Sequence, residues 1–249
     1  MMRERLVDAL HAGKTKAEYI DIRIEDESST AIWFHGPELD EIGSSRTLGG
    51  IVRALHKGGW GYSTFNDLNN LPARVNEACE AARMVGQGET RFAPVEPVVY
   101  ANTAHLEKDF REVPLPDKKA LAEGYNRLIL GYHPKIVTST MGYGDSFKKI
   151  WFATSEGTYI EDEQPNLYIF GAAVAREEDL VQSVFEMDGG FTSYTEVEGF
   201  EEKARNAAKR AVELLSAPVV KGGVYPVVVN PGLAGVFAHE AFGHLSEAD

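Results

Sequence analysis

Short alternations of hydrophobic and polar residues dominate the first part of the chain. Between residues 18 and 65 they form runs such as Tyr19–Ile24 and Thr30–Phe34, which are separated by glycine-containing turns. A period of two is typical of strands with one buried face, because successive side chains of a strand point to opposite sides. The pattern therefore predicts an antiparallel meander over these residues.

Helical periodicity follows each group of strands. The first predicted helix is capped by Asn69 or Asn70 and carries an apolar stripe along one face. A second helix is predicted over about 117–130. Thr195 and Glu198 have the spacing of a capping box, which predicts that a third helix opens there.

These elements predict an α+β fold of mostly antiparallel strands, with amphipathic helices following the strands in two successive halves. The N-terminal half is predicted over residues 1–87, a proline-rich connecting segment over 88–116 and a central half over 117–217. Residues 218–249 are predicted to start a C-terminal domain with a strand and a helix. Within the central half, the run Asp188–Gly190 predicts a hairpin turn.

The composition is that of a soluble globular protein. Charged residues make up 25% and hydrophobic residues 43% of the 249 positions, and the mean hydropathy is -0.25. Acidic residues outnumber basic ones by 38 to 25, which gives a net charge of -13. A nucleic-acid partner requires clustered positive charge that displaces counterions from phosphates, so we expect no DNA or RNA partner.

Neither a membrane span nor secretion is indicated by the sequence. The most apolar stretch, residues 218–238, is interrupted by Lys221, Asn230 and three prolines. A single cysteine, Cys79, excludes an intramolecular disulfide, so a cytoplasmic location is the default expectation. Cys79 lies on the apolar stripe of the first long predicted helix, and we expect it to be a buried structural thiol.

The residues with chemical potential lie near the end of the chain. A predicted strand at 225–229 leads into a helix capped by Asn230, and that helix carries His239, Glu240 and His244. Two imidazoles and a carboxylate on a helix are the groups with which zinc peptidases hold a metal ion and activate water, with glutamate as general base. The motif therefore indicates a candidate metal site.

The spacing of the two histidines makes a geometric prediction. His239 and His244 are five positions apart, which places them ~140° apart around a straight α-helix. We expect the helix to break or widen into a π-like turn at Gly243, because a wider turn brings such residues together. On spacing alone, a structural pair of histidines in a core or at a helix end remains an equal alternative.

The run 239–249, preceded by 227–231, resembles the metal-binding helix of the TldD/PmbA family, on the TldD side. Residues 61–68 and the helix after them resemble the N-terminal region of that family. The resemblance implies a zinc-dependent peptidase that acts on unfolded or flexible peptides, with His239 and His244 as metal ligands and Glu240 as the base. It also implies a PmbA-type partner subunit or a homo-oligomer.

In this family the third metal ligand is a cysteine of the C-terminal β-rich part, and Cys79 does not match that position. We therefore expect these residues to be the N-terminal portion of a longer protein, with 218–249 as the truncated start of the metalloprotease domain. By itself the fragment is expected to be inactive. The alternative from another class is a non-catalytic peptide-binding or assembly subunit, in which His239 and His244 are structural.

Overall fold

The chain divides into two compact units. The computed structural model describes residues 1–90 and 92–247, and contacts within the chain separate residues 1–216 from residues 217–249. Ala248 and Asp249, which end the run that carries the family resemblance, lie outside the described residues. Each unit is described by itself below.

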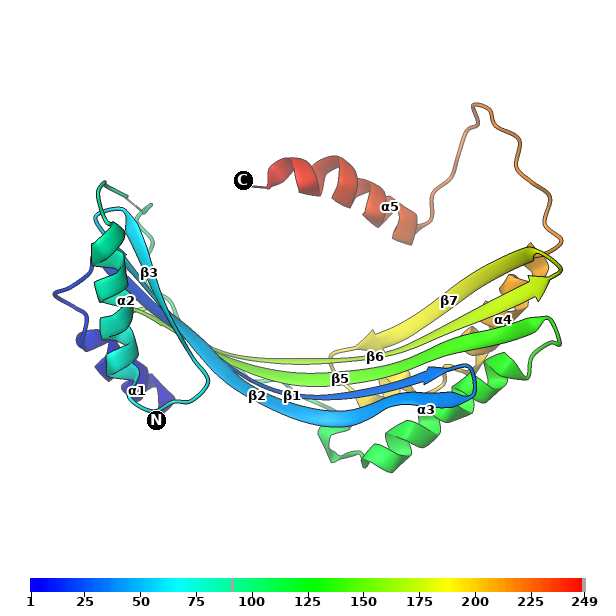
Figure 1. The fold of residues 1–249 in the computed structure, drawn as a ribbon, viewed down its shortest axis with the longest axis horizontal. Helices are drawn as coiled ribbons and strands as arrows, with labels where there is room; N and C mark the ends of the chain where they lie inside the picture. The colour runs from blue at the N-terminus through cyan, green and yellow to red at the C-terminus, as the bar shows by residue number, and fades with distance from the viewer. Residues whose placement is uncertain (91, 248–249) are drawn as a thin grey trace. The chain divides into compact units, whose positions relative to one another are not determined.

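A seven-stranded sheet is the centre of the first unit among the residues described (Figure 1). The strand order is β3-β2-β1-β5-β6, and all of these neighbours are antiparallel. On its other side β6 pairs with β7 in antiparallel fashion and, along a separate stretch, with β4 in parallel. The strands are β1 (Tyr19–His35), β2 (Glu38–His56), β3 (Gly59–Phe65), β4 (Val99–Asn102), β5 (Ile136–Thr154), β6 (Tyr159–Glu177) and β7 (Leu180–Gly190).

Two pairs of helices cover the two ends of this sheet (Figure 1). The helices are α1 (Met2–His11), α2 (Leu71–Val85), α3 (Leu115–Leu130) and α4 (Glu201–Leu214). At one end α2 packs on β3 and β2, and α1 packs on α2, β1 and β5. At the other end α3 and α4 pack on β5, β6 and β7. Among the described residues, no helix combines the length and the apolar character that a membrane crossing requires.

Strand β1 contributes to the hydrophobic core under each helix pair. Ile22 and Ile24 are buried with α1 and α2, whereas Ile32 and Phe34 are buried in the core beneath α3 and α4. These positions are separated by even numbers of residues, so both cores lie on the same side of β1. The predicted α+β class and the antiparallel meander are confirmed, and the strands of the two halves join in one continuous sheet.

The first long helix forms where the sequence places it. Asn70 is the residue before α2, although its side chain makes no capping hydrogen bond, and Gly86 follows the last residue of the helix. Gly61 of β3 lies against α2 so closely that a Cβ there would be 2.1 Å from the carbonyl oxygen of Ala78. The lack of a side chain at Gly61 therefore allows this strand and helix to pack together.

Two local predictions in the central part were wrong. Asp188–Gly190 ends β7 instead of forming a hairpin turn; the turn between β6 and β7 lies at Glu178, whose φ is 54°. Thr195 and Glu198 do not open α4, because the capping box that forms joins Ser193 to Glu196 on a short 3-10 helix. Ser193, two positions before Thr195, also offers a hydroxyl cap with a glutamate three residues later. The sequence pattern alone did not distinguish the Ser193–Glu196 pair from the Thr195–Glu198 pair.

The predicted connecting segment is partly regular. It contains β4 and the 3-10 helix η1 (Phe110–Glu112), and the side chain of Phe110 is fully buried. A buried aromatic residue anchors this proline-rich stretch to the core beneath α3 and α4. The domain boundaries at 87, 116 and 217 stay predictions.

The second unit consists of a non-regular stretch and one helical segment. The helical segment comprises α5 (Pro231–Ala238), the π-helical turn η3 (His239–Gly243) and the 3-10 turn η4 (His244–Ser246). The predicted strand at 225–229 is absent, and these residues have no regular secondary structure. A strand requires a neighbour that accepts and donates backbone hydrogen bonds, and no described strand pairs with this stretch.

Candidate metal centre

A well-capped helix start sets the direction of the segment that carries the motif. The side-chain oxygen Oδ1 of Asn230 accepts a hydrogen bond of 2.9 Å from the backbone N–H of Leu233. Pro231 occupies the first turn, where its missing N–H costs no intrahelical bond. The predicted cap is therefore confirmed, and α5 leads directly into the two histidines.

One backbone hydrogen bond determines the spacing of the histidines. The N–H of His244 donates to the carbonyl oxygen of His239, five residues earlier, which is the bond that defines a π-helical turn. The extra residue in this turn compensates for the ~140° separation expected on a straight α-helix. The predicted widening of the helix is thus confirmed, and His239 and His244 are its two ends.

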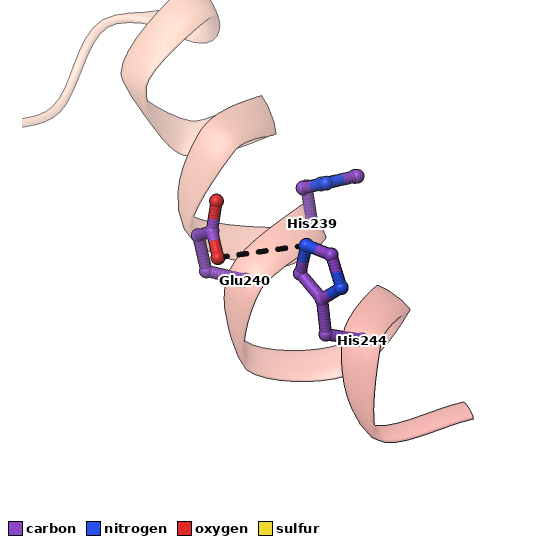
Figure 2. A group of neighbouring side chains, drawn as sticks. All are labelled: His239, Glu240 and His244. Carbon is purple, nitrogen blue, oxygen red and sulfur yellow. Dashed lines mark ion pairs between the residues drawn. The ribbon is translucent and has the colours of Figure 1, made fainter. Parts of the chain in front are cut away.

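The three side chains of the motif converge on one side of the turn (Figure 2). The ring centroids of His239 and His244 are 4.7 Å apart, and the ring planes are inclined by 80°. Oε2 of Glu240 lies 3.8 Å from Nε2 of His244. The structure therefore brings together all three residues that the sequence singled out.

The donor set fits a zinc ion. One nitrogen of each histidine and one carboxylate oxygen of Glu240 all lie within 4.8 Å of one another. Two atoms that each bind zinc at about 2.1 Å are at most about 4.2 Å apart, so small side-chain rotations suffice to close the site. The side chains of His244 and Glu240 are 50% and 65% exposed, which leaves them accessible to a metal ion.

Gly243 contributes to this geometry differently from what we expected. Its φ of -58° is an ordinary helical value that any residue adopts. A Cβ at this position would lie 3.6 Å from Nδ1 of His239, which is normal van der Waals contact. The widened turn exists, but neither the backbone angle nor the space around Gly243 requires glycine.

Glu247 is a fourth polar residue at the site, to which the sequence analysis gave no role. Its Oε1 lies 2.9 Å from Nδ1 of His244. The signal that could have revealed it is the i,i+3 spacing between a histidine and a carboxylate near a helix end. His244 thus has a carboxylate next to each of its ring nitrogens.

Cys79 lacks the character of a metal ligand. It is fully buried on α2, and burial raises the pKa of its thiol, which disfavours the thiolate that binds metals. The prediction of a buried structural thiol is confirmed. Among the residues that the structure describes, the motif cluster is the one group of three or more histidine, cysteine or acidic side chains close enough to share a metal ion.

A cluster of a different kind lies in the first unit. Lys118 of α3 donates a hydrogen bond to Oδ2 of Asp145 on β5, and the hydroxyl of Tyr143 donates to the same oxygen at 2.5 Å. All three residues are buried. Burial raises the pKa of Tyr143 far above its ordinary value, and the charge of Asp145 raises it further. Each polar group has a partner, which indicates a structural role.

Comparison with protein families matches two parts of the first unit. The model for domain 1 of the PmbA/TldA metallopeptidases matches residues 20–84, and the model for their central domain matches residues 108–215. Together these matches cover both ends of the sheet with helices α2, α3 and α4, whereas α1 lies before the first matched range.

Two curated relatives extend the similarity to most of the chain. A protein of Synechocystis sp. named a metalloprotease is 41% identical over 237 residues, which is 95% of this chain and 51% of the relative. A protein of Saccharolobus solfataricus named a zinc metalloprotease TldD homolog is 28% identical over 206 residues, or 80% of this chain and 43% of the relative. The chain thus spans about half the length of these relatives.

A solved structure has the same fold. A Bacteroides thetaiotaomicron protein described as a candidate modulator of DNA gyrase superimposes with a TM-score of 0.83 and 17% identity. The similarity covers 98% of this chain and 56% of that one. At this level of identity it shows the shared fold.

Proposed function

Because the chain belongs to the TldD/PmbA metallopeptidase family, we propose that it carries the metal-binding helix of a zinc-dependent peptidase. In this proposal His239 and His244 hold the ion and Glu240 is the general base. The observation that supports it most strongly is the backbone bond from His244 to His239, which turns two histidines with the wrong spacing for an α-helix into neighbours. The name of the Saccharolobus relative supports zinc as the metal.

The three residues divide the chemistry between them. A bound zinc ion lowers the pKa of coordinated water to about 7 and polarises the carbonyl of a peptide bond. Glu240, whose carboxylate lies on the same side as both imidazoles, accepts a proton from the attacking water and passes it to the leaving amine. Its side chain is 65% exposed, so the carboxylate is accessible to water.

A third protein ligand is needed to complete a typical catalytic zinc site. The family resemblance implies a cysteine from the C-terminal part, and the relatives are about twice as long as this chain. We propose unfolded or flexible peptides as substrates, and a PmbA-type subunit or a second copy of the protein as partner. These assignments follow from the resemblance and stay proposals.

The test uses the polypeptide of native length together with any partner that copurifies with it. Glu240→Gln is expected to retain zinc and to lower the cleavage rate of an unfolded protein substrate by about 10²- to 10⁴-fold. His239→Ala is expected to lose both zinc and activity. Glu202→Gln, on the surface of α4, serves as the matched control and should change neither.

The outcomes separate the two hypotheses. Undiminished cleavage by the Glu240→Gln variant would remove Glu240 from the mechanism. A wild-type protein that binds peptides with less than about a tenth of an equivalent of zinc, and cleaves none, would instead support the non-catalytic binding subunit. Zinc content is measured by elemental analysis after dialysis against metal-free buffer.

A further inference from the structure

We propose that Glu247 is a positioning residue that selects which ring nitrogen of His244 faces the metal. The inference rests on the proposed function, because it concerns the orientation of a metal ligand. It begins from two distances on opposite sides of one ring. Nδ1 of His244 lies 2.9 Å from Oε1 of Glu247, and Nε2 lies 3.8 Å from Oε2 of Glu240.

The chemistry of the two partners fixes the tautomer. An ionised carboxylate has acceptors only, so a hydrogen bond with Glu247 requires the hydrogen of a neutral His244 to be on Nδ1. The lone pair then resides on Nε2, which points toward Glu240 and His239 (Figure 2). A metal binds the nitrogen that carries the lone pair, so Glu247 presents Nε2 as the ligand atom.

The backbone after the π-turn places Glu247 within reach of the ring. The 3-10 turn η4 begins at His244, and Glu247 follows it with φ -70° and ψ 142°, where the chain leaves the helix. In a 3-10 turn residues three positions apart lie one above the other. The hydroxyl of Ser246 also donates to the carbonyl oxygen of Phe242 at 2.9 Å, which holds this last turn in place.

His239 provides a reference within the same site. Among the described residues, no carboxylate is hydrogen-bonded to a ring nitrogen of His239, whereas His244 has Glu247. Histidines that bind metals commonly donate their second N–H to a carboxylate, and loss of that partner typically lowers metal affinity by about 10- to 100-fold. The pair is half exposed, so we expect the lower end of this range.

The first experiment reads the tautomer directly and requires no metal. Nitrogen-15 NMR of the imidazoles is recorded in the metal-free chain, at a pH above the titration range of imidazole. We expect His244 to be mainly in the Nδ1–H form in the wild-type chain and to shift toward the Nε2–H form in Glu247→Ala. Glu247→Gln should lie between them, because an amide both donates and accepts.

The control for this experiment is Leu245→Ala, a neighbouring exposed position without a polar side-chain atom. It should leave the His244 tautomer unchanged, and the His239 signals should be the same in all variants. An identical tautomer of His244 in the wild-type, Glu247→Ala and Leu245→Ala chains would overturn the proposal.

The second experiment measures zinc affinity in the protein of native length by competition with a chelator. Glu247→Ala is expected to weaken zinc binding about tenfold, and Leu245→Ala to leave it unchanged. If Glu247→Ala binds zinc as tightly as the wild type, the positioning role fails and the proposed metal site stands. If the wild type binds no zinc, the proposed function fails, and the tautomer comparison still decides whether Glu247 orients His244.

Discussion

Two clusters of charged and polar side chains differ in burial, and this difference separates a structural role from a ligand-binding one. Lys118, Asp145 and Tyr143 are buried, and hydrogen bonds connect the ammonium and the hydroxyl to one carboxylate oxygen. The side chains of Glu240 and His244 are at least half exposed and are not saturated by protein partners. A buried cluster with every partner supplied fixes one arrangement, whereas an exposed one keeps lone pairs available for a ligand.

The two clusters are also assembled at different levels of structure. Asp145 and Lys118 come from β5 and α3, so they meet only when the helix packs on the sheet. His239, Glu240 and His244 lie within six consecutive residues, and one backbone hydrogen bond brings the two imidazoles together. The first cluster is therefore a product of tertiary structure and the second of a single turn.

The largest effect on stability in this comparison is expected for Asp145→Ala. The substitution leaves the buried ammonium of Lys118 without its counter-charge and the hydroxyl of Tyr143 without its acceptor. We expect the free energy of unfolding to fall by about 3–5 kcal/mol, as for other buried pairs that lose one partner. Denaturant-induced unfolding, followed by circular dichroism, measures the change.

Two further variants make that test specific. Glu240→Ala removes a carboxylate from the exposed cluster and should change the unfolding free energy by less than about 0.5 kcal/mol. The triple variant Lys118→Met, Tyr143→Phe and Asp145→Leu replaces all three polar groups of the buried cluster by apolar ones and should recover most of the stability. A loss as large for Glu240→Ala as for Asp145→Ala would contradict the division of roles.

Lys149 tests the intermediate case of a partly exposed pair. Its ammonium lies 2.7 Å from Glu161 and 3.0 Å from Glu163, both on the neighbouring strand β6. The hydrogen bond to Glu161 lowers the pKa of that carboxyl from its ordinary value of 4.5. A carboxyl group whose pKa is lower in the folded than in the unfolded state stabilises the fold. Its contribution is complete above the unfolded-state pKa and is lost as the pH falls through the folded-state pKa. Lys149→Met should therefore cost about 0.2–1 kcal/mol at neutral pH.

The pH dependence of that difference is the decisive measurement. Unfolding free energies of the wild type and Lys149→Met are compared from neutral pH downward, and the difference between them should shrink as the pH falls through the folded-state pKa of Glu161. Salt should reduce the difference at neutral pH, because a third of each side chain is in contact with solvent. A difference that grows on acidification would contradict the assigned pair.

The same comparison explains which features the sequence could predict. The alternating runs around Ile22 and Ile32 indicated the strands, because the period of two follows from burial on one face. The π-turn between His239 and His244 was also predictable, because residues five positions apart come together on a helix only if the helix widens between them. The pairing of Lys118 with Asp145 left no such signal, because residues 27 positions apart meet only through the packing of α3 on the sheet.

The wrong predictions have related causes. The strand expected at 225–229 has a strand-like composition but no described neighbour to pair with, and sequence composition contains no information on pairing partners. The capping box on Thr195 failed because Ser193 offers the same chemistry in another frame. Glu247 was not assigned a role because its contact with His244 becomes meaningful only after the turn is known.

The smallest effect is expected for Gly243→Ala, and this variant is the most direct test of what holds the π-turn in place. A Cβ there would contact the ring of His239 at 3.6 Å without overlap, and the backbone angles are helical, so the turn should persist. Gly235→Ala in α5 is the matched control, because its Cβ would meet nothing within 4 Å and both variants gain the same helix propensity. Zinc affinities of the two variants, measured by chelator competition, should agree within about fivefold, the factor that ~1 kcal/mol represents. A much weaker affinity for Gly243→Ala alone would mean that the missing side chain, and not the π-type hydrogen bond from His244 to His239, brings the imidazoles together.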